Sequence, residues 1–117
     1  MTNLRQLGLA GEDLAVQTLQ KQGYRIIARN YVTPLGEIDV IARQGEFLVF
    51  IEVKTRRSPR FGEAREALSP AKQARLQKLA AFYLKQNRLG PVQVRFDVVA
   101  IDFTPGEPRV EIIPGAF

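Results

Sequence analysis

The amino-acid sequence predicts an α/β fold in which a mixed β-sheet is flanked by helices. The expected elements run in the order helix, three strands, helix, two strands, and this order is typical of a sheet with helices packed against it. The third strand contains five consecutive apolar residues, Phe47 to Ile51, which is the pattern of a strand covered on both faces. The length of 117 residues favours one domain over residues 1–117.

The first element is expected to be a helix over residues 4–22. Apolar residues recur near helical spacing, and Gly23 stands where a glycine commonly ends a helix. Gly8 and Gly11 are poor helix formers, so they indicate either a late helix start or close packing against another backbone. Glu12 follows directly, and its spacing fits either a solvent-facing residue or a third acid that faces a site.

A three-stranded meander is expected next. Its strands cover residues 24–32, 37–43 and 47–54. Residues 33–36 have the composition of a turn, because they include proline and glycine. Residues 44–46 would join the second and third strands as an antiparallel hairpin.

Charged residues on the second and third strands form a candidate site. Side chains two apart on a strand point to the same face, so Glu37 should share a face with Asp39, and Glu52 should share a face with Lys54. Antiparallel pairing would bring Asp39 close to both Glu52 and Lys54. The alternative is that these charges form structural ion pairs, with Lys54 bonded to one of the two acids.

Two acids and one amine at one place suit metal-assisted hydrolysis of a phosphodiester. Carboxylate oxygens hold a hard divalent cation, which lowers the pKa of bound water and stabilises charge on the phosphate. The sequence has no cysteine or histidine, which excludes thiolate and imidazole metal sites and every Ser-His or Cys-His hydrolase. The expected cation is therefore Mg²⁺ or Mn²⁺. We expect Asp39, Glu52 and the backbone carbonyl of Val53 to bind it, and Lys54 to orient water or stabilise developing charge.

Basic residues are concentrated just after this site. Residues 54–78 hold eight basic residues and two acidic ones, whereas the whole chain has a net charge of +5. A localised basic patch is typical of proteins that bind polyanions, so the expected partner is nucleic acid, and DNA in particular. The alternative is an ordinary solvated surface. The expected phosphate-binding residues are Arg56, Arg57, Arg60, Lys72 and Arg75.

The patch spans a loop and the start of a second helix. Residues 55–68 are expected to form a mobile loop over the site, because they contain proline, glycine and four arginines. Ser69 and Pro70 then predict a helix start, as N-cap and first helical residue. The positive end of this helix is a place where a phosphate could bind. The helix is expected to end near residue 87.

Two further strands complete the chain. They are expected over residues 92–102 and 110–113. In the first of them, alternate apolar residues form one face, and Arg95 and Asp97 on the other face are expected to form a structural pair. No apolar run is long enough to span a membrane, and no signal peptide is visible, so the expectation is a cytoplasmic protein without a membrane partner.

These motifs resemble those of a known group of enzymes. Asp39 followed by Glu52-Val53-Lys54 resembles the PD-(D/E)XK nuclease signature, with Ile38 in place of a proline that binds no metal. Nearly the whole chain resembles the YraN family of small bacterial proteins, assigned to the PD-(D/E)XK nuclease-like superfamily, and its arrangement is similar to that of archaeal Holliday-junction resolvases. The matching residues are Gly8, Gly11, Glu12, Ala15, Gly23, Tyr24, Asn30, Gly36, Glu37, Ile38, Asp39, Phe50, Ile51, Glu52, Val53, Lys54, Lys72, Arg75, Leu76, Arg95, Phe96, Asp97 and Val98.

The resemblance implies a restriction-endonuclease-like α-β-β-β-α-β core. It also implies a catalytic role for Asp39, Glu52, Lys54 and Glu12, and it adds Gln73 to the residues expected near nucleic acid. The function that follows is a magnesium-dependent DNA endonuclease, with structure-specific cleavage in repair or recombination and a homodimer as further expectations. The alternative is a nucleic-acid-binding module that keeps the fold without catalysis.

Overall fold

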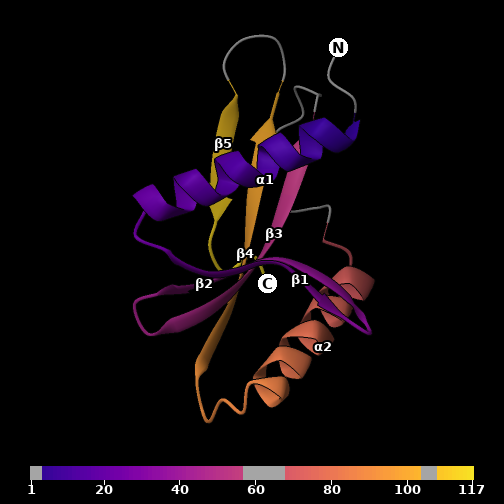
Figure 1. Cartoon of the computed structure of the whole chain (residues 1–117), viewed down its shortest axis with the longest axis vertical. Coiled ribbons are helices and arrows are strands. Elements are labelled where there is room, and N and C mark those ends of the chain that lie inside the picture. Colours follow the sequence, from indigo (N-terminus) through magenta and orange to yellow (C-terminus); the bar gives the residue numbers. More distant parts are fainter. Residues whose placement is uncertain (1–3, 57–67, 104–107) are drawn as a thin grey trace.

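The computed structural model describes residues 4–56, 68–103 and 108–117 (Figure 1). Over these residues the chain forms two helices and five strands. The elements are α1 (Leu4–Lys21), β1 (Arg25–Thr33), β2 (Gly36–Gln44), β3 (Phe47–Arg56), α2 (Pro70–Gln86), β4 (Gln93–Asp102) and β5 (Arg109–Ile113). The predicted α/β class is confirmed, and each expected element is present within a few residues of its predicted bounds.

The five strands form one mixed sheet in the order β1-β2-β3-β4-β5. The first three strands are antiparallel neighbours, which confirms the predicted meander. Strand β3 pairs in parallel with β4, and β5 is antiparallel to β4. Because parallel neighbours need a crossover connection, α2 lies in the segment that joins β3 to β4 (Figure 1).

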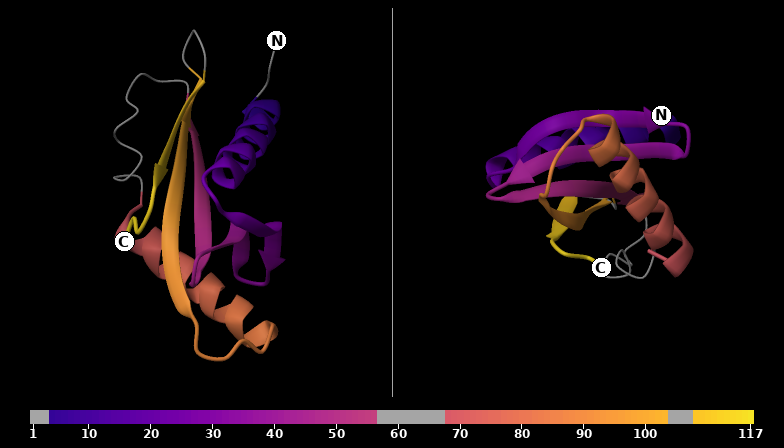
Figure 2. Two further views of the ribbon diagram at one scale, coloured as in Figure 1. Left: turned by 90° about the vertical axis from the view of Figure 1, so that its left-hand side faces the viewer. Right: turned by 90° about the horizontal axis from the view of Figure 1, so that it is seen from below.

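The sheet is covered by one helix on each face (Figure 2). On β3, Leu48 and Phe50 belong to the core beneath α2, whereas Val49 and Ile51 belong to the core beneath α1. This alternation explains the continuous apolar run that the sequence shows, since both faces of β3 are buried. Among the described helices, none is long and apolar enough to cross a membrane.

The predicted helix ends are present. The Ser69 hydroxyl accepts a hydrogen bond from the backbone N–H of Lys72 at 3.2 Å, and Pro70 is the first residue of α2. Gly23 follows α1 with φ of +89°, a left-handed conformation that glycine adopts without steric cost. These two caps fix where α2 begins and where α1 turns back into β1.

A buried polar network holds the N-terminal end of β4. The carboxylate of Asp97 is 1% exposed and pairs with Arg95 at 2.8 Å, which confirms the predicted pair. It also accepts hydrogen bonds from the Tyr24 hydroxyl at 2.7 Å and the Gly115 N–H at 3.0 Å. Burial, followed by the hydrogen bond to Asp97, raises the pKa of Tyr24 to about 12. These partners balance the buried charge of Asp97 and satisfy its oxygens, and a charge buried in a folded protein requires both.

Candidate acidic site where β2 and β3 diverge

The site begins where the backbone pairing of β2 with β3 stops. The pairs run from Gln44 opposite Phe47 to Val40 opposite Ile51. Beyond the last pair, the carboxylate of Asp39 accepts a hydrogen bond from the backbone N–H of Val53 at 2.9 Å. A side chain of β2 thus bonds the β3 backbone just beyond the last backbone pair, and this places the carboxylate between the two strands.

The two chain neighbours of Asp39, Ile38 and Val40, pack in the cores on opposite faces of the sheet. Ile38 lies with Ile41 in the core beneath α2, and Val40 lies in the core beneath α1. The charge of Glu37 raises the pKa of Asp39, so the two side chains lie near one another, and their sharing of one face stays a prediction.

Asp39 lies in an environment that opposes its negative charge. Burial raises its pKa from the ordinary value of 3.8 to about 6, and the hydrogen bond from Val53 opposes this rise. The charges of Glu52, Glu12 and Glu37 raise the pKa further. Repulsion of this kind is relieved by a proton or by a cation. A half-buried carboxylate with a perturbed pKa is a candidate functional residue.

Glu52 and Lys54 form an ion pair beside Asp39. The Nζ atom of Lys54 lies 3.5 Å from Oε1 of Glu52, and the side chains are 23% and 13% exposed. This is the structural pairing that the sequence left open. Lys72 of α2 lies at the same place. A hydrogen bond to Lys54 and the charge of that lysine lower the pKa of Lys72, whereas the charge of Glu52 raises it. Two amines therefore lie beside one carboxylate.

Glu12 reaches the site because α1 lies very close to β3. A Cβ atom on Gly11 would lie 2.5 Å from Oγ1 of Thr55, which is closer than a carbon can approach. Any other residue at position 11 would force the Thr55 side chain or the helix to shift. The expectation of a late helix start is wrong, because α1 already begins at Leu4. The close contact at Gly11 is with the side chain of Thr55 rather than with a backbone.

Asn30 connects Glu12 to Glu37, and sequence reasoning did not assign it a role. The orientation of its amide follows from its acidic neighbours: the nitrogen donates to Glu37 Oε1 at 2.8 Å and to the two carboxylate oxygens of Glu12 at 3.1 and 3.2 Å. Asn30 has φ of +51°, a left-handed conformation in which asparagine is enriched. An asparagine inside an otherwise strand-like segment is the signal that could have pointed to it.

The residues expected to bind nucleic acid divide into three groups. Lys72 and Arg75 lie at the start of α2, and their charges act on one another. The Gln73 amide instead donates to the backbone carbonyl of Leu68 at 2.9 Å, so it stabilises the start of the helix. Arg57, Arg60 and the side chain of Arg56 lie outside the part of the chain that the structure describes, as does most of the loop expected over residues 55–68.

The acidic side chains near Asp39 that could supply oxygen ligands to a metal ion are Glu52, Glu12 and Glu37. Within the described residues, no three acidic side chains are grouped closely enough to hold a metal ion together. Mg²⁺ commonly uses one or two carboxylates, together with water and substrate phosphate oxygens. Asp39 and Glu52, with the carbonyl of Val53, fit that smaller set, and the carboxylate of Asp39 is one whose charge burial and neighbouring acids oppose.

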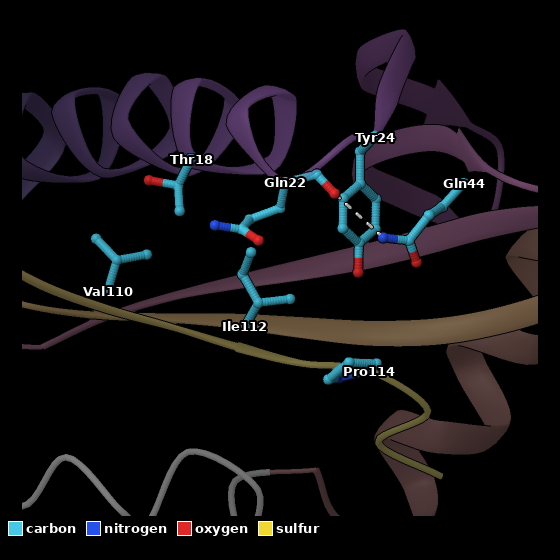
Figure 3. Close-up of a pocket in the computed structure, with 7 residues that line it drawn as sticks. All are labelled: Thr18, Gln22, Tyr24, Gln44, Val110, Ile112 and Pro114. Atoms are coloured by element: carbon cyan, nitrogen blue, oxygen red, sulfur yellow. Dashed lines mark hydrogen bonds between the residues drawn. The ribbon is translucent and has the colours of Figure 1, made fainter.

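A pocket lies at the other end of α1 (Figure 3). Its volume is about 380 Å³. The lining residues are Thr18, Gln22, Tyr24, Gln44, Val110, Ile112 and Pro114. None of these seven is acidic or basic, and the Gln44 amide already donates to the Gln22 carbonyl at 3.4 Å. The pocket therefore lacks groups for phosphodiester chemistry, and the acidic site remains the candidate.

Comparison with known proteins gives similarity over nearly the whole chain. A model of the family described as "Uncharacterised protein family UPF0102" matches residues 11–101. A UPF0102 protein of Syntrophus aciditrophicus is 45% identical over 117 residues, which cover 100% of this chain and 92% of that protein. A UPF0102 protein of Moorella thermoacetica is 49% identical over 115 residues, which cover 97% and 96% of the two chains.

Similarity to solved structures is much weaker. The structure titled "The structure of Pyrococcus Furiosus SfsA in complex with Ca2+" is 17% identical and gives a TM-score of 0.34. The match covers 96% of this chain and 64% of that one, so the present chain spans less than two thirds of its length. A TM-score this low does not establish a shared fold.

Proposed function

The chain belongs to the UPF0102 family, and we propose that it is a metal-dependent nuclease that hydrolyses phosphodiester bonds in DNA. We also propose that the elements from α1 to β4 form a restriction-endonuclease-like core. Membership of this family does not by itself indicate an enzymatic activity. The proposal rests on the chemistry of the acidic site.

The observation that carries the proposal is the position of Asp39. Its carboxylate is half-buried, lies where β2 and β3 diverge, and has a pKa raised to about 6. Next to it, Glu52 is paired with Lys54. A carboxylate kept in such an environment destabilises the fold by itself, so a function in which it meets a cation gives a reason for its presence.

The residues have separate roles in this proposal. Asp39, Glu52 and the Val53 carbonyl would hold Mg²⁺ or Mn²⁺, which when bound supplies an activated water and stabilises charge on the phosphate. Lys54 lies 3.5 Å from Glu52, so its ammonium group would be close to a phosphate bound to a cation that Glu52 helps to hold. There it would stabilise the charge that builds up as the bond to the leaving oxygen breaks.

Three further residues, Gly11, Asn30 and Lys72, contribute to the site. Gly11 permits the close approach of α1 that brings Glu12 to the acids. Asn30 holds Glu12 and Glu37 together through its amide, and Lys72 adds a second amine beside Lys54. Glu12 would therefore act from the outer side of the site, where its charge adds to the attraction for a cation.

A second function is favoured by a specific observation. Each acid near Asp39 already has a partner: Glu52 has Lys54, and Glu12 and Glu37 share Asn30. An arrangement of this kind can also be a stable, non-catalytic scaffold. The alternative is thus a nucleic-acid-binding module in which Lys54, Lys72 and Arg75 contact phosphates.

The test is cleavage of a panel of labelled substrates by wild type and Glu52→Gln. The panel contains linear duplex, single-stranded, flapped and four-way-junction DNA, and the equivalent RNA single strand. Wild type is expected to cleave at least one DNA substrate with Mg²⁺ or Mn²⁺ and none with EDTA, whereas Glu52→Gln should lose at least about 10²-fold in rate.

The matched control is Glu46→Gln, which removes an exposed acid from the turn before β3. It should cleave like wild type. Binding of DNA without cleavage of any substrate, under every metal condition, would contradict the nuclease proposal and support the binding module.

A further inference from the structure

The tip of the β1–β2 hairpin exposes large apolar side chains next to the acidic site. Val32 is 74% exposed and Leu35 is 54% exposed, and Pro34 between them is also exposed. Scattered exposed apolar residues are ordinary on a protein surface, but a group of them beside a functional site indicates a contact surface. These three residues are called the hairpin tip below.

The hairpin tip is held rigidly. The buried hydroxyl of Thr33 accepts the N–H of Leu35 at 3.0 Å and donates to the Gly36 carbonyl at 2.8 Å. Gly36 has φ of +141°, which favours glycine, and the position of its absent Cβ lies 3.7 Å from the Leu79 side chain of α2. The rings of Tyr31 and Tyr83 make an edge contact at 5.2 Å. The tip is thus fixed against α2, with its apolar side chains turned to solvent.

The hairpin tip also lies close to the acids. Val32 is paired across the hairpin with Glu37. Glu37 shares Asn30 with Glu12, and its charge raises the pKa of Asp39. In Figure 1, the turn between β1 and β2 lies on the same side of the molecule as the first turns of α1 and α2. The basic residues Lys72 and Arg75 belong to those first turns of α2.

We propose that the hairpin tip is a wedge that contacts an unstacked base step next to the phosphate held at the acidic site. This inference rests on the proposed function and defines its substrate class: nucleic acid in which at least one base step near the scissile phosphate is already open. Leucine and proline are among the side chains that proteins insert between base steps.

The wedge would favour substrates in which a base step is already open. Opening a base step in continuous duplex costs free energy, whereas a flap, bulge or junction has already lost that stacking. Apolar side chains that fill the open step gain burial without that cost. A nucleic acid is favoured over a second copy of this chain because the helix against which the tip packs carries Lys72 and Arg75 in its first turns. A second copy would bring the same positive charges together.

The experiment compares binding to two DNA molecules by fluorescence anisotropy, with EDTA present so that no metal-dependent cleavage occurs. One is a linear duplex and the other is the same duplex with an unpaired bulge, with 2-aminopurine beside the open step. Wild type is expected to prefer the bulged DNA by about 10-fold and to change the 2-aminopurine fluorescence. Val32→Ser/Leu35→Ser should bind both molecules equally and leave the fluorescence unchanged.

The matched control is Ile27→Ser/Leu89→Ser, which removes two other exposed apolar side chains and should keep the preference. Because all four positions are exposed, thermal melting should be the same for the three proteins. Equal binding of both DNA molecules by wild type, or an unchanged preference in Val32→Ser/Leu35→Ser, would overturn the wedge. So would a dimer of wild type that this variant dissociates. The comparison needs no cleavage, so it still tests the wedge if wild type cleaves no substrate with Mg²⁺.

Discussion

Replacing Asp39 with asparagine should stabilise the folded protein at neutral and alkaline pH. Asparagine has nearly the same shape and keeps an oxygen that can accept the N–H of Val53. What the substitution removes is a negative charge that burial and the charge of Glu52 oppose. The free energy of unfolding of Asp39→Asn should therefore exceed that of wild type by the amount by which the ionised Asp39 destabilises the wild-type fold.

The size and sign follow from the pKa of Asp39. The pKa rises from 3.8 to about 6 on folding, so the folded state binds the proton more tightly than the unfolded state. The stability that protonation contributes is complete below about pH 4 and is lost as the pH rises through about 6. Each pKa unit corresponds to about 1.4 kcal/mol, which gives an upper bound of about 3 kcal/mol. Because Asp39 is partly exposed and solvent screens its charge, we expect about 1–2 kcal/mol.

Urea unfolding followed by circular dichroism, with EDTA present, measures this difference at about pH 4 and about pH 8. Asp39→Asn should be more stable than wild type at the higher pH and equal to it at the lower pH. The control is Asp13→Asn, which loses only an exposed pair with Arg29 and should be slightly destabilised or neutral. A variant Asp39→Asn that is less stable than wild type at the higher pH, or a difference that does not change with pH, would refute the reasoning.

Four other substitutions test the site. Lys54→Met keeps the side-chain stem but removes the ammonium group, so single-turnover cleavage should fall by about 10²-fold or more while DNA affinity falls only slightly; full cleavage with a lower melting temperature would make Lys54 structural. Gly11→Ala should destabilise the protein by about 1 kcal/mol in urea unfolding, because the clash with Thr55 exceeds the gain in helix propensity. Lys72→Ala and Arg75→Ala should each reduce the log-log salt slope of DNA binding by about 0.9, in anisotropy titrations over a salt series.

Controls for these variants come from the same elements. Gly90→Ala has open space at its Cβ position and should be neutral or slightly stabilising, so equal destabilisation of both glycine variants would contradict the packing argument. Lys85→Ala and Arg88→Ala remove basic residues from the far end of α2 and the turn after it. They should leave the salt slope unchanged, and a loss equal to that of Lys72→Ala would place the DNA elsewhere.

The sheet and its helices were predictable because their signals are local. The apolar run from Phe47 to Ile51 indicates a strand that is buried on both faces, and the structure places alternate residues in the two cores. Ser69 followed by Pro70 marks the start of α2 through a hydrogen bond within one helical turn. The proximity of Asp39 to Glu52 also followed, since it requires only antiparallel pairing of neighbouring strands.

What the sequence did not reveal depends on contacts between distant segments. The placement of Ile38 and Val40 in cores on opposite faces is visible only in the packed sheet, and no local pattern encodes it. The role of Asn30 depends on the approach of Glu12 from α1, which in turn depends on the fit of Gly11 against Thr55. The ion pair of Glu52 with Lys54 was one of two open readings, because side-chain geometry decides it.

Titration of Mn²⁺ into wild type, Asp39→Asn and Asp13→Asn by calorimetry tests the central claim most directly, which is that Asp39 and Glu52 hold a divalent cation. Wild type and Asp13→Asn should bind the ion with the same affinity, and the binding should weaken at a pH below about 6 as Asp39 takes up a proton. Asp39→Asn should bind at least about 10-fold more weakly, because it loses a charged ligand. Equal binding by wild type and Asp39→Asn, or no binding by wild type at any pH, would contradict the account.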